Sequence, residues 1–267
     1  MEKIGLIAGN RRFPILFAQA ALNKGFTVTA IAIKKDTSPK LKKYVDKLYW
    51  LGLNEFSRMF EIFKSEGITK IVMAGQISPR RLFTKELNSD STLKKMLAGL
   101  KDKRADTIFS AIAEEIKKQG FQLIESITFM GEFLPKKAAL TTNLPDSCVL
   151  EDIYFGLEIA KGVALLDIGQ TVAVKHKAIV AVEALEGTDN LIQRAGKISR
   201  GGFTVVKVSK PKQDLRFDVP VVGLSTIKNL YKAGGVCLAI EAGKTLFIDQ
   251  AESIKLAEGK AISIVAV

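Results

Sequence analysis

The chain has 267 residues, of which 47% are hydrophobic and 25% are charged, a balance typical of globular domains that bury a core without disulfide bonds. Its 40 Lys and Arg residues exceed its 28 Asp and Glu residues, and the formal net charge of +12 favours anionic partners. The two cysteines, Cys148 and Cys237, lie far apart without neighbouring ligand residues, which argues against a disulfide framework or a zinc site and indicates a reducing compartment.

The basic residues are spread along the whole chain. No arginine-rich arm, zinc finger or aromatic RNA-binding signature accompanies them, so we expect a phosphate-bearing ligand and not nucleic acid. The apolar stretch at the N-terminus is too short for a signal peptide, and no window approaches the roughly 18 apolar residues of a spanning helix. We therefore expect a cytoplasmic protein.

The first 125 residues alternate apolar runs with amphipathic stretches, the pattern of a parallel sheet covered by helices. Strands are predicted at residues 4–8, 27–33 and 71–76, with a weaker one at 122–126. Helical spacing of apolar residues occurs at 13–24, 55–66 and 104–119. This half is predicted to be a Rossmann-like α/β domain over residues 1–130.

The alternation of apolar runs and amphipathic stretches ends at residues 131–148, where Gly131, Pro135 and Pro145 predict a connection between domains. Beyond a short predicted helix near 152–161, strands are predicted at 171–176, 178–184, 203–208, 236–240, 245–248 and 262–267. The first two form a hairpin that turns at His176 and Lys177. The second half is therefore predicted to be a β-rich α/β domain over 149–267, with a ligand cleft between the two domains.

Two loops of the first domain follow strands at the carboxyl edge of the sheet, where open α/β folds bind ligands. One contains Gly9 and Asn10 and leads into a helix opened by Pro14, so free backbone N–H groups there could bind an anion. The other contains Gly75 and Gln76. We expect the two loops to face one crevice, although the first is also compatible with an ordinary strand-to-helix turn.

An acidic cluster at the end of the second strand of the hairpin contains Glu183, Glu186 and Asp189, together with the hydroxyl of Thr188. Carboxylates at this density suit a hard cation such as Mg²⁺, which takes oxygen ligands. The alternative is structural, because Thr188 or Asp189 could be the N-cap of a helix that includes residues 191–195.

The segment 210–223 alternates charged with apolar residues and is bracketed by Pro211 and Pro220. Lys210 and Arg216 could neutralise a phosphate, while Asp214 or Asp218 could hold a metal or activate a water. The alternative is a solvated loop with surface ion pairs. His176 is the only histidine and lies at a predicted turn, so triad chemistry is not expected.

These blocks together resemble the UDP-2,3-diacylglucosamine pyrophosphatases of bacterial lipid A synthesis, of the type distinct from the metallophosphoesterase enzymes. The most specific blocks are AVEALEGTDNLIQRAG at 181–196, KPKQDLRFDVPVVGLSTI at 210–227 and AIEAGKTLFID at 239–249. The blocks GLIAGNRRFP, IVMAGQI and DTIFSAIAEEIKKQGF in the first half look similar as well. The resemblance covers most of the chain.

The resemblance implies hydrolysis of the substrate's pyrophosphate to UMP and 2,3-diacylglucosamine 1-phosphate (lipid X), with Mg²⁺ or a similar cation such as Mn²⁺. In the family the aspartate of the RFD-P motif is essential, and it falls on Asp218, with Asp214 as the second catalytic candidate. The candidate metal ligands are Asp218, Asp189 and Glu186. The candidate substrate-binding residues are Gly9, Asn10, Gly75, Gln76, Thr188, Arg194, Lys210, Gln213 and Arg216.

A lipid substrate implies peripheral contact with the inner membrane surface, which a basic rim would favour, and a homodimer is one assembly compatible with the sequence. Two rival functions remain open. One is an NADP-type oxidoreductase, for which Lys34 and Lys35 after the second strand could bind a 2′-phosphate, although the glycine fingerprint is missing. The other is a noncatalytic nucleotide- or phospholipid-binding protein.

Overall fold

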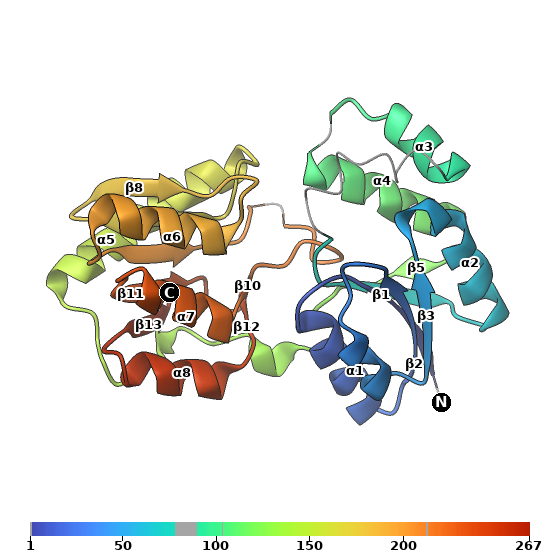
Figure 1. Ribbon diagram of the computed structural model, residues 1–267, viewed down its shortest axis with the longest axis horizontal. Helices are drawn as coiled ribbons and strands as arrows, with labels where there is room; N and C mark the ends of the chain where they lie inside the picture. Colours follow the sequence, from blue (N-terminus) through green and yellow to red (C-terminus); the bar gives the residue numbers. More distant parts are fainter. Residues whose placement is uncertain (1, 78–89, 103, 212) are drawn as a thin grey trace. The chain divides into compact units, whose positions relative to one another are not determined.

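The computed structural model describes residues 2–77, 90–102, 104–211 and 213–267, which divide into two compact units. Unit 1 comprises Met1–Met130 and Asp214–Asp218, and unit 2 comprises Gly131–Gln213 and Val219–Val267 (Figure 1). The short segment Asp214–Asp218 is thus part of unit 1, although the chain on either side of it belongs to unit 2. Sequence analysis had counted it with the second domain.

Unit 1 is built on a five-stranded sheet with the order β3-β2-β1-β4-β5. Its strands are β1 (Lys3–Ala8), β2 (Thr27–Ile33), β3 (Lys47–Leu51), β4 (Lys70–Ala74) and β5 (Gln122–Leu123), and every neighbouring pair is parallel. The predicted Rossmann-like sheet is confirmed, and its order reverses at β1. Strand β3 was not predicted; it lies at the sheet edge, and only Leu51 of its five residues is buried.

Helices cover both faces of this sheet. Helix α1 (Phe13–Asn23) packs on β1, β2 and β4, while α2 (Phe56–Ser65) and α4 (Ala105–Lys118) contribute Phe63 and Ile116 to the core on the other face. These helices match the predicted ones to within one residue at each end. The packing is close: a Cβ on Gly5 of β1 would lie 2.8 Å from the Phe63 ring. The short helix α3 (Ser91–Ala98), of which only Leu93 is buried, was not predicted.

Unit 2 contains a six-stranded sheet with the order β6-β13-β11-β9-β7-β8. Its strands are β6 (Ala138–Ala139), β7 (Thr171–Lys175), β8 (Ala178–Val182), β9 (Thr204–Lys207), β11 (Cys237–Ile240) and β13 (Ser263–Ala266). The central strands β9, β11 and β13 are parallel, and the outer ones are antiparallel to their neighbours. Two short strands, β10 (Val221–Val222) and β12 (Leu246–Phe247), form a separate parallel pair.

The predicted hairpin is confirmed as β7 and β8. Its turn residues His176 and Lys177 both adopt left-handed backbone conformations, with φ of 51° and 58°. That combination matches the twist of a two-residue hairpin turn. The remaining predicted strands of unit 2 are also present, each shortened by one to three residues at its ends.

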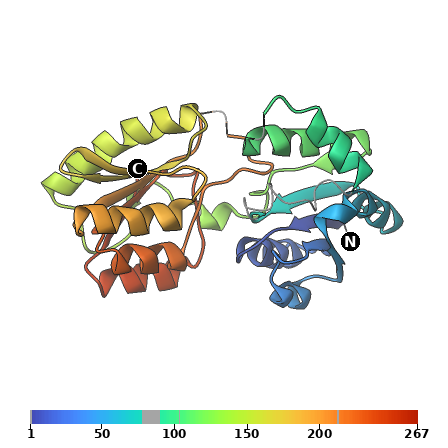
Figure 2. The same cartoon turned by 45° about the horizontal axis from the view of Figure 1, so that its top comes forward.

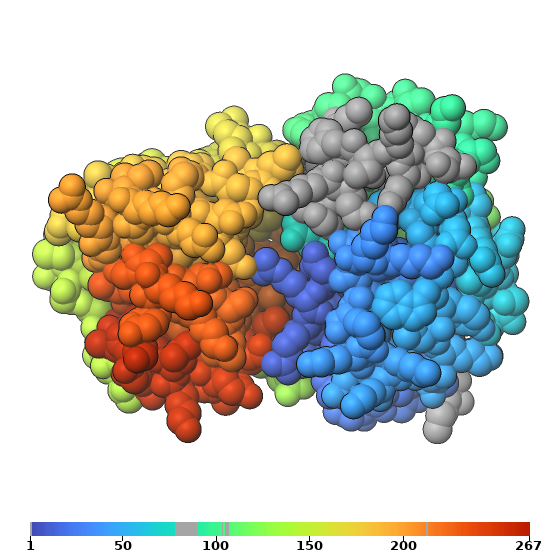
Figure 3. Space-filling model, viewed as in Figure 1, coloured from blue at the N-terminus to red at the C-terminus, as the bar shows by residue number. Residues whose placement is uncertain are grey.

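Helices also sandwich the sheet of unit 2. Helix α5 (Ser147–Leu165) lies on one face, and α6 (Thr188–Ser199), α7 (Leu224–Lys232) and α8 (Gln250–Glu258) lie on the other (Figure 2). In the space-filling view, the orange and red residues of these last three helices form much of the visible surface of unit 2 (Figure 3). Helix α5 is longer than predicted, and α7 and α8 were not predicted, so unit 2 is less dominated by strands than its sequence suggested.

The start of α6 corrects a further expectation. Gly187, with φ of 82°, occupies the N-cap position, and Thr188 is the first helical residue. Neither Thr188 nor Asp189 is therefore the N-cap.

None of the helices in the described part of the chain combines the length and apolarity needed to span a bilayer.

Candidate functional site

The loops after β1 and β4 lie against each other at the carboxyl edge of the unit 1 sheet. The amide of Gly9 donates to the Ala74 carbonyl at 2.8 Å, and the amide of Asn10 donates to the Gln76 carbonyl at 2.8 Å. The two predicted loops are thus brought together beside β1, where the strand order reverses. Open α/β sheets bind ligands at this position.

Glycine is required on both sides of this contact. A Cβ on Gly9 would lie 2.7 Å from the Gln76 carbonyl oxygen, and a Cβ on Gly75 would lie 2.6 Å from the Asn10 carbonyl oxygen. Gly75 also has a φ of 82°, a backbone conformation that residues with a side chain rarely adopt.

Asn10 Oδ1 is buried and has no hydrogen-bond partner among the described residues. A ligand donor at that oxygen would relieve the cost of burying it.

The segment Asp214–Asp218 is fastened to the same unit by backbone and side-chain contacts. The Leu215 carbonyl accepts a hydrogen bond of 2.8 Å from the Ser126 amide, and the Phe217 ring stacks on Phe109 with 5.5 Å between centroids. Both catalytic candidates therefore belong to the unit that carries the Gly9 and Gly75 loops.

Within this segment Asp214 and Arg216 form an ion pair. Arg216 donates from Nε and Nη2 to the carboxylate of Asp214, at 2.9 Å and 2.6 Å for the two shortest contacts. The hydrogen bonds from Arg216 lower the pKa of Asp214 despite its partial burial, and the same contact raises the pKa of Arg216. Asp218 is half-buried, and its amide donates to the Asp214 carbonyl at 2.9 Å.

In unit 2 the polar residues also gather where the parallel strands end. Lys207, the last residue of β9, is 6% exposed and donates to the Thr188 hydroxyl at 2.7 Å. That hydroxyl donates in turn to Glu183 Oε1 at 2.7 Å, and Glu183 is 8% exposed. A buried ammonium and a buried carboxylate are thus joined through one threonine, which satisfies both charges.

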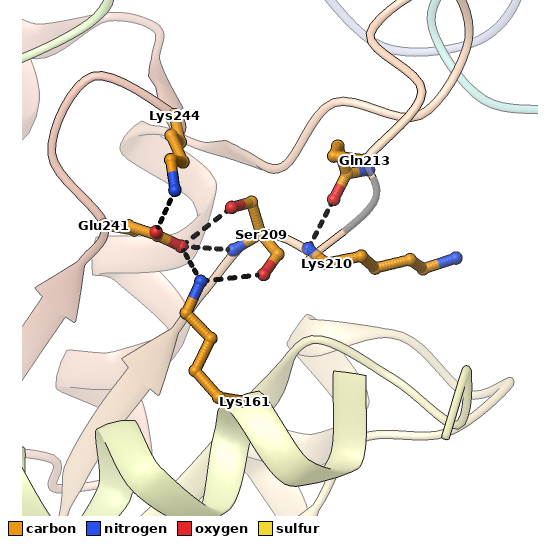
Figure 4. Close-up of polar contacts among 6 residues, drawn as sticks. All are labelled: Lys161, Ser209, Lys210, Gln213, Glu241 and Lys244. Carbon is orange, nitrogen blue, oxygen red and sulfur yellow. Dashed lines mark hydrogen bonds and ion pairs between the residues drawn. The ribbon is translucent and has the colours of Figure 1, made fainter. Parts of the chain in front are cut away.

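A second network at this edge centres on Glu241, which follows β11 (Figure 4). Its carboxylate accepts hydrogen bonds from Lys161 at 2.5 Å, from Lys244 at 2.8 Å and from both the amide and the hydroxyl of Ser209 at 2.8 Å. Burial disfavours ionisation, but these donors outweigh it and lower the pKa of Glu241 to about 2. The carboxylate therefore stays charged at neutral pH.

The loop that follows β9 is held by two further contacts. The amide of Lys210 donates to Gln213 Oε1 at 2.6 Å, as Figure 4 shows, and Lys210 Nζ contacts Asp167 Oδ1 at 2.6 Å. The Lys210 side chain points away from Glu241 in that view. Lys210 and Gln213 thus lie at the edge that carries both polar networks.

The remaining candidates lie around the start of α6. Arg194 forms an ion pair with Glu186 and donates from Nη2 to the Val182 carbonyl at 2.8 Å, and Asp189 lies in the first turn of the helix. Glu186 and Asp189 therefore belong to unit 2, whereas Asp218 belongs to unit 1. No group of three or more His, Cys, Asp or Glu side chains suited to a metal occurs among the described residues.

Sequence reasoning did not select Ser126, Lys207 or Lys161. Ser126 and Lys207 fall within runs that were assigned to strands, and Lys161 falls within a predicted helix, so their side chains carried no separate signal. A signal for Lys207 existed in its place near the carboxyl end of the strand predicted at 203–208, because ligand-binding edges form at the ends of such strands in open α/β sheets. Glu241 entered the sequence analysis only as part of the block AIEAGKTLFID at 239–249.

Comparison with known proteins follows these two units. The family model for the LpxI N-terminal domain matches residues 3–133, and that for the LpxI C-terminal domain matches residues 136–265. A protein named UDP-2,3-diacylglucosamine pyrophosphatase LpxI, from Caulobacter vibrioides, is 29% identical over 278 residues, which cover 100% of this chain and 98% of that protein.

Similarity to solved structures is weaker. The CobK precorrin-6A reductase superposes with a TM-score of 0.35 and 10% identity over 100% of this chain and 87% of that structure. The biotin carboxylase domain of a single-chain bacterial carboxylase superposes with a TM-score of 0.25 and 11% identity. That match covers 64% of this chain and 35% of the carboxylase domain structure, so the chain spans about a third of its length.

Proposed function

This chain belongs to the LpxI family, and we propose that it hydrolyses the pyrophosphate of UDP-2,3-diacylglucosamine to UMP and lipid X in lipid A synthesis. The observation that carries the proposal is the match of both LpxI domain models, in order, over residues 3–133 and 136–265. A relative named for this activity also aligns with the whole chain.

The geometry of unit 1 supports a reaction at a phosphate. The loops of Gly9 and Gly75 meet at the reversal point of a parallel sheet, and the segment that carries Asp218 is fastened to the same unit. A diphosphate resists hydrolysis because its negative charge repels nucleophiles, so a site must offset that charge while it orients a water. Unit 1 therefore carries both the candidate ligand-binding edge and the candidate catalytic carboxylate, which supports the proposal.

We assign the role of general base to Asp218. In the reaction a water oxygen bonds to phosphorus, the bond from that phosphorus to the bridging oxygen breaks, and the bridging oxygen leaves with the other phosphate. The carboxylate of Asp218 accepts the proton of the attacking water. Arg216 binds the carboxylate of Asp214 through two nitrogen atoms, and this contact points to a different role for Asp214. We propose that Asp214 orients Arg216, whose guanidinium is 40% exposed and available to a phosphate oxygen.

A divalent cation, Mg²⁺ or Mn²⁺, forms part of this proposal. Mg²⁺ is commonly held by one or two protein carboxylates, with waters and substrate phosphates as its other ligands. Asp218 of unit 1 fits that pattern as a single carboxylate ligand, and in unit 2 the candidate ligands are Asp189 and Glu186. When bound, the cation offsets charge on the diphosphate.

We also propose that the protein works in the cytoplasm at the inner membrane surface, where a diacylated substrate resides. The net charge of +12 supports contact with anionic lipids. Such association is peripheral.

Incubation with UDP-2,3-diacylglucosamine and Mg²⁺ in ¹⁸O-labelled water tests the reaction and its regiochemistry together. The family resemblance leads us to expect the label in UMP, since attack at the phosphorus next to uridine transfers the water oxygen there. Mass analysis of both products gives the answer. Unchanged substrate, or release of a product other than UMP and lipid X, would contradict the proposed function.

A further inference from the structure

Strand β5 leaves the unit 1 sheet one hydrogen bond earlier than its register implies. The amide of Ile124 donates to the Ile71 carbonyl at 2.9 Å, so the next bond of this parallel ladder should join the Ser126 amide to the Met73 carbonyl. The Ser126 hydroxyl takes that place and lies 2.6 Å from the Met73 carbonyl oxygen. A side chain thus replaces the backbone as the donor to β4.

The Ser126 amide, which the hydroxyl replaces as the donor to β4, instead binds the segment 214–218. The Ser126 amide donates to the Leu215 carbonyl at 2.8 Å, and the Ser126 hydroxyl also lies 2.9 Å from the Arg216 carbonyl oxygen. Ser126 is only 1% exposed, so water cannot readily substitute for these bonds. The hydroxyl has one hydrogen, which the carbonyl oxygens of Met73 and Arg216 share, while the amide binds Leu215. One buried serine therefore links the end of β4 to the segment.

The next residue of the segment is held by an aromatic contact. Phe217 stacks on Phe109 of α4 with 22° between the ring planes, and it packs against the core of unit 1. Leu215, Arg216 and Phe217 are thus each attached to unit 1 immediately before Asp218. The position of the Asp218 backbone follows from these attachments.

We propose that Ser126 is a positioning residue for the pyrophosphatase reaction, which holds Asp218 in place at the carboxyl edge of the unit 1 sheet. The Ser126 hydroxyl contacts Met73, which lies two residues before Gly75, and Arg216, which lies two residues before Asp218. It therefore fixes the catalytic segment to the loop of the ligand-binding edge. This inference rests on the proposed function.

The first test compares Ser126→Ala with Thr128→Val in the full-length protein. Thr128 lies two residues further on, and its hydroxyl donates to the nearby Glu125 carbonyl, so its loss is a control for removal of a hydroxyl next to the same turn. Ser126→Ala should lower kcat for UDP-2,3-diacylglucosamine roughly 10- to 100-fold with little change in KM, because a displaced base affects the transition state more than substrate binding. Thr128→Val should leave both constants within about threefold of wild type.

Amide hydrogen exchange provides a readout that does not depend on activity. The Asp218 amide donates to the Asp214 carbonyl inside the segment, so loosening the segment exposes that amide to exchange. The peptide that spans 214–218 should therefore exchange faster in Ser126→Ala than in wild type, and its exchange rate should be unchanged in Thr128→Val. Should Ser126→Ala fail to fold, Phe109→Leu loosens the same segment through the ring stack and should also speed its exchange. Wild-type exchange of segment 214–218 in folded Ser126→Ala, or in Phe109→Leu where that variant takes its place, would overturn the inference.

A double-mutant comparison separates positioning from a general structural effect. If Ser126 acts through Asp218, Ser126→Ala should change kcat little in a protein that already carries Asp218→Ala. An equal fold-loss of kcat in both backgrounds would overturn the positioning role. If wild-type protein releases no UMP, the proposed function and the role in turnover fail together, while the exchange experiment still decides whether Ser126 holds the segment.

Discussion

Arg216 binds the carboxylate of Asp214 through Nε and Nη2, with nitrogen–oxygen distances of 2.6 to 3.2 Å. The Asp214 carboxylate is thus bound by the guanidinium of a residue in its own loop. Asp218, four residues further on, contributes its amide to the turn that Asp214 begins. We therefore expect replacement of the two aspartates to affect turnover differently.

Replacement of Asp218 by Ala should lower kcat by roughly a thousandfold, equivalent to about 4 kcal/mol of lost transition-state stabilisation. The melting temperature should change little. Asp214→Ala should have a much smaller effect on kcat, and because its ion pair is partly exposed the cost in stability should be about 0.2 to 1 kcal/mol. Steady-state kinetics and thermal melts of both variants check the assignment, which near-wild-type kcat for Asp218→Ala would disprove.

Removal of divalent cations should abolish UMP release. Exhaustive chelation of the wild-type protein, followed by stepwise addition of Mg²⁺ or Mn²⁺, should restore turnover in a saturable way, since the cation offsets charge on the diphosphate. Addition of Na⁺ at matched ionic strength is the control for screening. Full activity in the chelated protein would exclude the metal-dependent reaction.

Gly75→Ala should destabilise unit 1 by more than the usual penalty for a side chain at positive φ. Gly120 is a matched control, because its φ of 89° is similar but a Cβ there would have nothing within 4 Å. We expect Gly120→Ala to cost about 1 kcal/mol. Gly75→Ala should cost at least about 1 kcal/mol more, since its Cβ would lie 2.6 Å from the Asn10 carbonyl oxygen. Urea denaturation of the two variants gives the comparison, and equal losses would contradict the predicted clash.

Glu241→Gln should reduce stability at neutral pH, by about 1 to 3 kcal/mol. Its folded-state pKa of about 2 lies below the ordinary value of 4.5. The stabilisation from its ionised form is therefore complete above about pH 5 and is lost as the pH falls toward 2. The difference between Glu241→Gln and wild type, measured by denaturation at pH 7, 5 and 3, should shrink with falling pH. The exposed Glu158 supplies the control variant Glu158→Gln, and a pH-independent difference for Glu241→Gln would refute the account.

Lys207→Met should destabilise unit 2 by about 3 to 5 kcal/mol, because it leaves the buried carboxylate of Glu183 without its cationic partner across Thr188. The double variant Lys207→Met with Glu183→Gln should recover part of that loss. Denaturation of the single and double variants gives the coupling energy, and strict additivity would show that the two charges do not interact.

The sequence determined most of the fold, because its elements are encoded locally. Apolar runs such as 27–33 and amphipathic stretches such as 13–24 show their periods directly, and both appear in the structure almost as predicted. The hairpin turn at His176 and Lys177 could also be located, since the two apolar runs on either side leave only those residues between them. Edge strand β3 and helices α3, α7 and α8 escaped prediction, because their burial depends on the elements that they pack against.

The candidate site followed a similar division. Sequence blocks selected Gly9, Gly75 and Asp218, but whether Asp214 or Asp218 carried the ion pair with Arg216 could not be read from their spacing. The membership of 214–218 in unit 1 was likewise invisible, because it depends on Ser126, some ninety residues earlier in the chain.

What the tertiary structure alone decided is therefore the partners of buried polar groups. A backbone carbonyl or a side-chain charge needs a hydrogen-bonding or charged partner when it leaves water, but the amino-acid sequence does not say which group that partner is. Lys207 finds Glu183 through Thr188, and the Ser126 hydroxyl replaces a ladder hydrogen bond, because the packed sheets bring those groups within reach. Local pattern specifies where strands and helices form, and chain packing selects which polar groups meet at their ends.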